Sequence, residues 1–175
     1  CLEEKLKEMK ANNSNLDVIT FSGNGEPTGH PNFLEIVEDT IQLRNKYYPK
    51  AKVSVLTNST LAHKTNVHRA LELVDNNIMK LDTVDPEYIK KVNRPESSAF
   101  NVEEIIKQMQ SFNGHVIIQT MFMHGTDDLG NDVSNTDDRY VIPWLNAIRR
   151  IKPSDVDIET ARNSGMPCIS VLWGF

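Results

Sequence analysis

The feature that most constrains the fold of this chain is a regular alternation of strand-like and helix-like segments. Short, mostly apolar runs occur at 18–21, 53–57, 78–81 and 115–121. Between and after them, apolar residues recur every three or four positions, as in amphipathic helices, at 2–9, 33–41, 67–74, 86–92, 102–109 and 140–150. Connections of this length are too long for hairpins and favour parallel strands joined by right-handed crossovers. The pattern therefore predicts an α/β fold.

The length of the chain limits which α/β fold it can form. A chain of 175 residues suffices for one domain with its own core. A complete eight-stranded β/α barrel needs roughly 200–250 residues. The sequence offers five or six strands, including a run at 168–173. We therefore expect an incomplete parallel barrel or a doubly wound sheet, with flanking helices.

The final segment, 154–175, predicts a helix followed by a strand. Ser154 suits the N-cap of a helix, and Gly165 suits its end. Three acidic residues suit the positive first turn of that helix: Asp155, Asp157 and Glu159. We expect residues 1–153 to form the partial barrel and this tail to pack on the same domain.

Composition and charge exclude several classes of protein. Hydrophobic residues make up 39% of the chain and charged residues 25%, which is ordinary globular usage. No apolar run approaches the roughly 20 residues that span a bilayer, and residues 1–20 show no signal-peptide pattern. A net charge of −5 disfavours non-specific binding to nucleic acid or anionic membranes. We expect a soluble cytoplasmic protein with a small-molecule partner.

Polar residues gather where the predicted strands end. In parallel α/β folds, ligands bind beyond the carboxyl ends of the strands. Here those positions carry amides, hydroxyls, two carboxylates and a lysine, at 22–28, 57–60, 80–83 and 119–121. Because these ends meet at one rim, the sequence predicts a site for a polar small molecule.

The segment Gly23–Pro27 (GNGEP) is the most informative part of that rim. Two glycines permit positive φ angles and a close approach of the backbone to a ligand, and Glu26 adds a negative charge. Carbonyl groups exposed in such a turn can accept hydrogen bonds from an ammonium group. A tight strand-to-helix turn without a ligand is an equal alternative. A dinucleotide fingerprint is excluded because position 28 is Thr rather than Gly.

Residues 18–28 (VITFSGNGEPT) resemble the second strand and Gly-Gly-Glu-Pro motif of radical S-adenosylmethionine (radical SAM) proteins. The resemblance covers roughly residues 1–152. It continues, in order and spacing, through four further segments: Val53–Leu61, Lys80–Asp82, Asn93–Pro95 and Ile118–Phe122.

The resemblance implies a partial β/α barrel that binds S-adenosylmethionine (SAM). In the family, a [4Fe–4S] cluster cleaves SAM reductively to a 5′-deoxyadenosyl radical. The segment 24–27 would hold the methionine amino group, Asn58 and Ser59 would lie near the ribose or carboxylate, and Asp82 and Gln119 would line the cofactor or substrate side. The implied binding residues are Ser22, Gly23, Asn24, Gly25, Glu26, Pro27, Asn58, Ser59, Asp82 and Gln119. Helix capping is the alternative role for Asn58 and Ser59, and a cap or an ion pair with a nearby lysine is the alternative for Asp82.

The chain departs from the family at its cluster motif. The family pattern C-x-x-x-C-x-x-C occurs nowhere, and the chain has two cysteines, Cys1 and Cys168. Two thiolates do not hold an iron–sulfur cluster. The resemblance therefore implies that the first strand and the cluster loop are missing and that this chain is inactive by itself. A sheet edge left open in this way would favour self-association.

Two alternative functions remain open. The tail, 154–175, resembles the late helix and strand of haloacid-dehalogenase-type phosphatases, with matches at Ser154 and Asp157, although their nucleophile motif is absent. A non-catalytic α/β module that binds a ligand is the other alternative. No metal site is predicted, because His63 and His68 are five positions apart and the Asp-rich stretch 127–138 lacks calcium-loop spacing. The substrate is not indicated by the sequence.

Overall fold

The computed structural model describes residues 1–23, 25–95 and 100–162 of the chain. It contains a five-stranded, fully parallel sheet in which the strands are adjacent in chain order. The strands are β1 (Val18–Phe21), β2 (Lys52–Thr57), β3 (Asn76–Lys80), β4 (Ile117–His124) and β5 (Asp155–Arg162). An unbroken order of parallel strands is the arrangement of a β/α barrel that has not closed, which is one of the two arrangements that the sequence pattern predicts.

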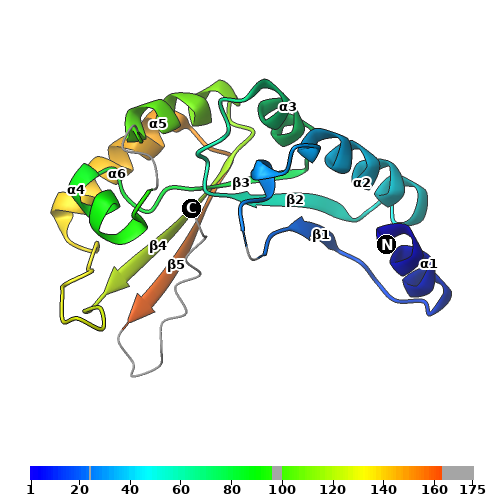
Figure 1. Ribbon diagram of the computed structural model, residues 1–175, viewed down its shortest axis with the longest axis horizontal. Coiled ribbons are helices and arrows are strands. Elements are labelled where there is room, and N and C mark those ends of the chain that lie inside the picture. The colour runs from blue at the N-terminus through cyan, green and yellow to red at the C-terminus, as the bar shows by residue number, and fades with distance from the viewer. Residues whose placement is uncertain (24, 96–99, 163–175) are drawn as a thin grey trace.

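The helices follow the strands in turn. They are α1 (Leu2–Ala11), α2 (Phe33–Tyr47), α3 (Thr65–Leu73), α4 (Pro86–Tyr88), α5 (Val102–Ser111) and α6 (Asp138–Ile151), with a short 3₁₀ turn η1 (Pro27–Gly29) and a π-helical turn η2 (Ile89–Asn93). Figure 1 shows the helices along one side of the curved sheet, with α1 beyond β1 at one end.

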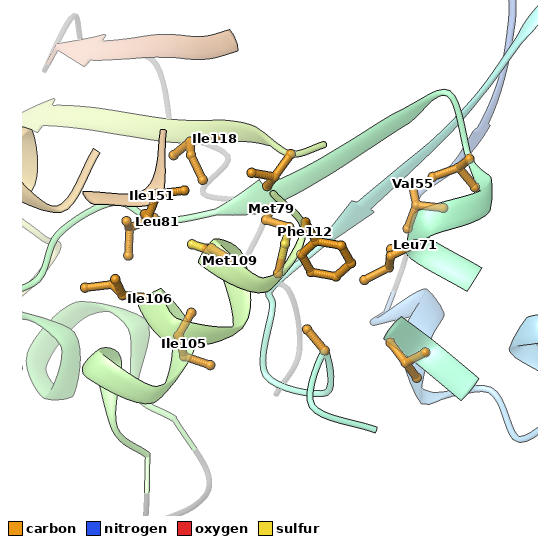
Figure 2. Packing of buried hydrophobic residues seen from close by; sticks show 14 of the residues in the cluster. Val55, Leu71, Met79, Leu81, Ile105, Ile106, Met109, Phe112, Ile118 and Ile151 are labelled. Atoms are coloured by element: carbon orange, nitrogen blue, oxygen red, sulfur yellow. The ribbon is translucent and has the colours of Figure 1, made fainter. Parts of the chain in front are cut away.

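The core lies between the sheet and this layer of helices. Every second strand residue faces the helices, and four of these apolar side chains are completely buried: Val53, Val55, Met79 and Ile118. Apolar residues from α3 and α5 pack onto them, and Figure 2 shows Leu71, Ile106 and Met109 beside the strands. The apolar periods of the helices and the alternation of the strands therefore produce one continuous core.

The opposite face of the sheet is more polar. Residues that are partners in register lie on the same face, and one such row is formed by Lys80, Gln119 and Asp157. A second row is formed by Thr20, Ser54 and Asn76. In an incomplete barrel this polar face is the inner surface.

The prediction of a helix at the start of the tail is wrong. Residues 155–162 form β5, which pairs with β4 over its whole length, beginning at Ile117 and Asp155. Val156 and Ile158 alternate with acidic residues, a two-residue period that suits a strand better than a helix. The tail therefore begins by extending the sheet of the main domain. Gly165 and the predicted strand at 168–173 lie outside the described residues.

β1 is an edge strand of the described sheet, and Val18 is 42% exposed there. Self-association through this edge stays a prediction. None of the helices in the described part of the chain combines the length and apolar character needed to cross a membrane.

Candidate functional site

The carboxyl ends of β1 to β4 carry the polar segments singled out in the sequence. Because the strands are parallel and adjacent, these ends lie along one edge of the sheet. Gly23 and Gly25 follow β1 with φ angles of 151° and 155°, and the Gly25 N–H donates to the Gly23 carbonyl at 2.9 Å. A Cβ atom at either glycine would meet no atom within 4 Å. The glycines are therefore needed for the backbone conformation and not for space.

Glu26 joins this loop to the end of β2. Its Oε1 accepts hydrogen bonds from the Thr28 N–H at 3.1 Å and from the hydroxyls of Thr28 and Thr57, both at 2.6 Å. Its Oε2 accepts from the Asn58 N–H at 2.7 Å. The carboxylate thus fixes the position of the glycine loop relative to the second strand end. Ser22 is exposed beside the loop and Pro27 begins η1, while Asn24 lies outside the described residues.

The two candidates after β2 differ in accessibility. Asn58 is partly exposed, and its Oδ1 accepts from the N–H and hydroxyl of Thr60. Ser59 is completely buried with a φ of 70°, and its hydroxyl donates to the Lys80 carbonyl at 3.4 Å. The helix-cap alternative is wrong for both, because α3 begins only at Thr65 and its N-cap is Lys64. Ser59 is a structural link between β2 and β3, and Asn58 remains at the rim.

Asp82, which follows β3, is held from three directions. Its Oδ1 accepts from the Met121 N–H at 2.9 Å, and its Oδ2 accepts from the Asn93 amide at 3.1 Å. Lys80 Nζ lies 3.3 Å from the same Oδ2. The side chain of Asp82 is only 7% exposed. The alternative role of Asp82, an ion pair with a nearby lysine, is therefore confirmed. Asp82 also lies at the rim.

Two further side chains shape this region and were missed in the sequence. Asn135 is completely buried, and its Nδ2 donates to the carbonyls of Met121 at 3.0 Å and Asp82 at 3.3 Å, while its Oδ1 accepts from the Met123 N–H. Trp144 Nε1 donates to the Leu81 carbonyl at 2.9 Å. These contacts hold the end of β3 against β4. Their sequence separations, from 12 to 63 residues, give no local signal.

A small pocket opens beside Asn58 and Asp82. Its volume is about 40 Å³, and it is lined by Asn58, Lys80, Leu81, Asp82, Thr83, Ile89, Asn93, Pro95, Phe100, Val102 and Ile105. The walls are apolar where α5 contributes and polar where the strands end. Nearby, burial raises the pKa of the Tyr88 phenol, and the negative charge of Asp82 adds to this effect. The tyrosine is therefore a neutral donor, and it bonds to the Val133 carbonyl at 2.7 Å.

The structure brings most of the candidate residues together. Glu26 bonds to Asn58, and Asn58 and Asp82 line the same pocket. Gln119 lies one strand further along, where its amide donates to Glu159 at 3.1 Å, and it does not line this pocket. The rim is thus continuous from β1 to β3, and Gln119 belongs to the inner face of the sheet beside it.

The residues of this rim suit a zwitterionic, donor-bearing ligand better than an iron–sulfur cluster. The loop offers backbone atoms beside a carboxylate, and the pocket-lining residue Asn93 has a buried acceptor, Oδ1, with no hydrogen-bond partner among the described residues. A cluster needs several thiolates, and of the two cysteines Cys1 is exposed at the start of α1 and Cys168 lies outside the described part. Within residues 1–23, 25–95 and 100–162, no three His, Cys, Asp or Glu side chains are grouped for a metal ion.

Comparison with known proteins supports the same family. The sequence profile of the radical SAM superfamily matches residues 2–133. The UPF0026 protein slr1464 of Synechocystis is 34% identical over 148 residues, which are 82% of this chain and 50% of that protein. A UPF0026 protein of Helicobacter pylori is 26% identical over 147 residues, covering 83% of this chain and 44% of the relative. The chain thus spans about half the length of these relatives.

Solved structures show the same fold. Streptococcus suis SuiB bound to S-adenosylmethionine superposes with a TM-score of 0.60 over 91% of this chain and 32% of SuiB, at 17% identity. A domain of pyruvate-formate lyase-activating enzyme from Bacteroides vulgatus gives a TM-score of 0.51 over 81% of this chain. Since the superfamily profile covers most of the chain and the sheet has the neighbours' partial-barrel arrangement, this chain belongs to the radical SAM superfamily.

Proposed function

We propose that this chain forms the SAM-binding part of a larger radical SAM enzyme and is inactive by itself. The observation that carries the proposal is the Glu26 carboxylate, which ties the glycine loop of β1 to Asn58 beside the pocket at Asp82. Family membership implies SAM and a [4Fe–4S] cluster as cofactors. When bound, SAM supplies the adenosyl group of the radical chemistry, and the cysteines of this chain are too few to hold the cluster.

Different rim residues would contact different parts of SAM. The backbone of 23–27 would accept hydrogen bonds from the methionine ammonium group, whose positive charge is favoured beside Glu26. Asn58 would contact the ribose or the carboxylate. Asp82 would line the cofactor side, held by Asn93 and Met121. Gln119, on the inner face of the sheet, would face the substrate.

The structure of the tail weakens one of the two alternative functions, the phosphatase. The phosphatase resemblance depends on a helix that opens at Ser154 and Asp157, and the described residues of that segment form β5. A non-catalytic binding module remains compatible with the fold, and it differs from our proposal in the ligand. SAM binding therefore separates the two.

The test is binding of SAM to the full 175-residue chain, measured by isothermal titration calorimetry. Gly25→Ala strains a loop residue with a φ of 155°, and Gly130→Ala is a matched control with a φ of 80° in another loop. An added Cβ meets nothing within 4 Å at either site, so the cost at each is the backbone strain, about 1–3 kcal/mol. We expect Gly25→Ala to weaken SAM binding roughly tenfold or more, and Gly130→Ala to leave it unchanged. Absence of binding to the unmodified chain, or equal affinities in the two variants, would refute the proposal.

A further inference from the structure

One residue that lines the pocket behind the end of β3, Asn93, has a buried acceptor whose hydrogen-bonding capacity is unused. Asn93 Oδ1 is buried and has no partner within the described residues, whereas the Nδ2 of the same side chain donates to Asp82 Oδ2 at 3.1 Å. A buried acceptor without a donor costs stability, and such groups in native proteins are usually satisfied by water or a ligand. The atom therefore marks a place for a donor that the described residues do not supply.

The local backbone is built to hold Asn93 in this position. Asn93 ends the π-helical turn η2, and Arg94 follows it with a φ of 47°, in the left-handed region. The Arg94 N–H donates to the Ile89 carbonyl at 2.9 Å and closes the turn. Wide helical turns of this kind are rare and occur frequently at functional sites. The conformation turns the Asn93 side chain back toward the strand end instead of toward solvent.

We propose that Asn93 has two roles in the site: it positions the Asp82 carboxylate through Nδ2, and it accepts through Oδ1 a hydrogen bond from an N–H or O–H group of the nucleoside part of SAM. This inference rests on the proposed function. The pocket volume of about 40 Å³ admits one small donor group, and the apolar walls formed by Ile89, Val102 and Ile105 offer no competing acceptor on their side of the pocket. A neutral donor suits this place because Lys80 already pairs with Asp82.

The positioning role can be measured without any ligand. The Met121 amide donates to Asp82 Oδ1, so its ¹⁵N–¹H resonance reports where that carboxylate lies. Asn93→Ala and Asn93→Asp both remove the donor to Asp82. We expect both variants to shift the Met121 resonance and to accelerate the hydrogen exchange of its amide. Asn146→Ala, an exposed asparagine on the outer side of α6, is the control and leaves Met121 unchanged. An unchanged Met121 signal in Asn93→Ala would overturn the positioning role.

The acceptor role is tested with nucleoside probes titrated into the full chain. Adenosine is compared with 2′-deoxyadenosine, 3′-deoxyadenosine and purine riboside, each of which lacks one donor. In the unmodified chain we expect one analogue to bind roughly tenfold more weakly than adenosine. Asn93→Ala has no side-chain acceptor and should bind that analogue and adenosine equally well. Asn93→Asp keeps an acceptor oxygen and should still bind adenosine more tightly than that analogue.

Equal discrimination in the unmodified chain and in Asn93→Ala would show that the pocket holds only water, and the acceptor role would be refuted. If neither SAM nor adenosine binds the unmodified chain, the proposed function fails as well. The two failures are therefore distinguishable. Thermal melting of each variant, compared with Asn146→Ala, identifies any loss of binding that comes from unfolding.

Discussion

Glu26 shows how one side chain can organise a binding rim. Its carboxylate accepts four hydrogen bonds, two from Thr28 in its own loop and one each from Thr57 and Asn58 across the sheet. Hydrogen bonds to a charged acceptor are stronger than neutral ones. The sequence identified Glu26 as a charge beside a ligand, and the structure shows that the same group first fixes the loop.

A carboxamide at position 26 should disrupt this arrangement. Glu26→Gln keeps one acceptor oxygen and turns an NH₂ group toward donors, so we expect the free energy of unfolding to fall by about 1–3 kcal/mol. Urea unfolding followed by circular dichroism measures the change. Glu35→Gln, at an exposed position in the first turn of α2, is the matched control and should change it by only a few tenths of a kcal/mol. Equal effects of the two substitutions would contradict the assigned role.

Sequence reasoning at this scale succeeded where the partners are close in the chain. The ion pair of Lys80 and Asp82 spans two residues and was foreseen as an alternative. The contacts of Asn93 and Asn135 with Asp82 span 11 and 53 residues, and both asparagines lie in segments that resemble ordinary turns. Asn93 was marked in the sequence only by the family resemblance and Asn135 by no pattern, and only the folded sheet brings both to the end of β3.

At the scale of elements, Asp75 connects three parts of the fold at the amino end of the sheet. Its Oδ2 accepts from the Val53 N–H in β2 and from Arg44 in α2, both at 2.8 Å. Partial burial by itself raises the pKa of Asp75, but these hydrogen bonds outweigh it and hold the pKa below its ordinary value. The carboxylate therefore stabilises the folded state when it is charged.

This lowered pKa predicts how stability depends on pH. The contribution of Asp75 is complete well above the unfolded pKa of about 3.9 and is lost as the pH falls through the lower folded value. Asp75→Asn should therefore reduce the free energy of unfolding clearly at about pH 7 and much less at about pH 3. Asp39→Asn, at an exposed site on α2, should show no such dependence. A deficit in Asp75→Asn that is the same at both pH values would contradict the assignment.

The loop between β4 and α6 is more ordered than its acidic composition suggested. Thr126 and Asp132 form an isolated bridge, and the Tyr88 hydroxyl donates to the Val133 carbonyl. Asn135 then anchors the loop to β4 through both its backbone N–H and its side chain. The acidic composition of 127–138 gives no indication of these contacts.

Removal of that anchor should loosen the loop. Asn135→Ala removes the partner of three backbone groups, the Met123 N–H and the carbonyls of Asp82 and Met121. We therefore expect a loss of about 1–3 kcal/mol in the free energy of unfolding. Limited proteolysis should then cut within 125–134 faster than in the unmodified chain. Asn131→Ala, in the exposed part of the same loop, should change stability by less than about 0.5 kcal/mol. Proteolysis rates that do not separate the two variants would refute the anchoring role.

The tail shows why local patterns are weakest next to a sheet edge. Ser154 and the following acidic residues satisfy the rules for the start of a helix, and the same residues also alternate with Val156 and Ile158. In the fold, the Ser154 N–H and hydroxyl both bond to the Val116 carbonyl, and β5 then pairs along β4. Pairing with an available edge satisfies the backbone of a whole segment, and this outweighs a single cap.

For the whole molecule, the alternating pattern predicted the architecture well. Parallel strands with flanking helices follow from connection lengths and apolar periods. The choice of a partial barrel over a doubly wound sheet followed from the family resemblance. The rows of the polar inner face could not be predicted, because they depend on the register between strands. The superfamily match and the fold of SuiB agree with this architecture.

The central claim is that SAM binds along the carboxyl ends of β1 to β3. The most direct measurement is an NMR titration of the ¹⁵N-labelled 175-residue chain with SAM, in which the shifted amides locate the ligand. Our account predicts that the largest shifts fall on Gly25, Asn58, Asp82 and Asn93, with none at the amino ends of the strands near Asp75. Shifts centred elsewhere, or no shifts at saturating SAM, would contradict it.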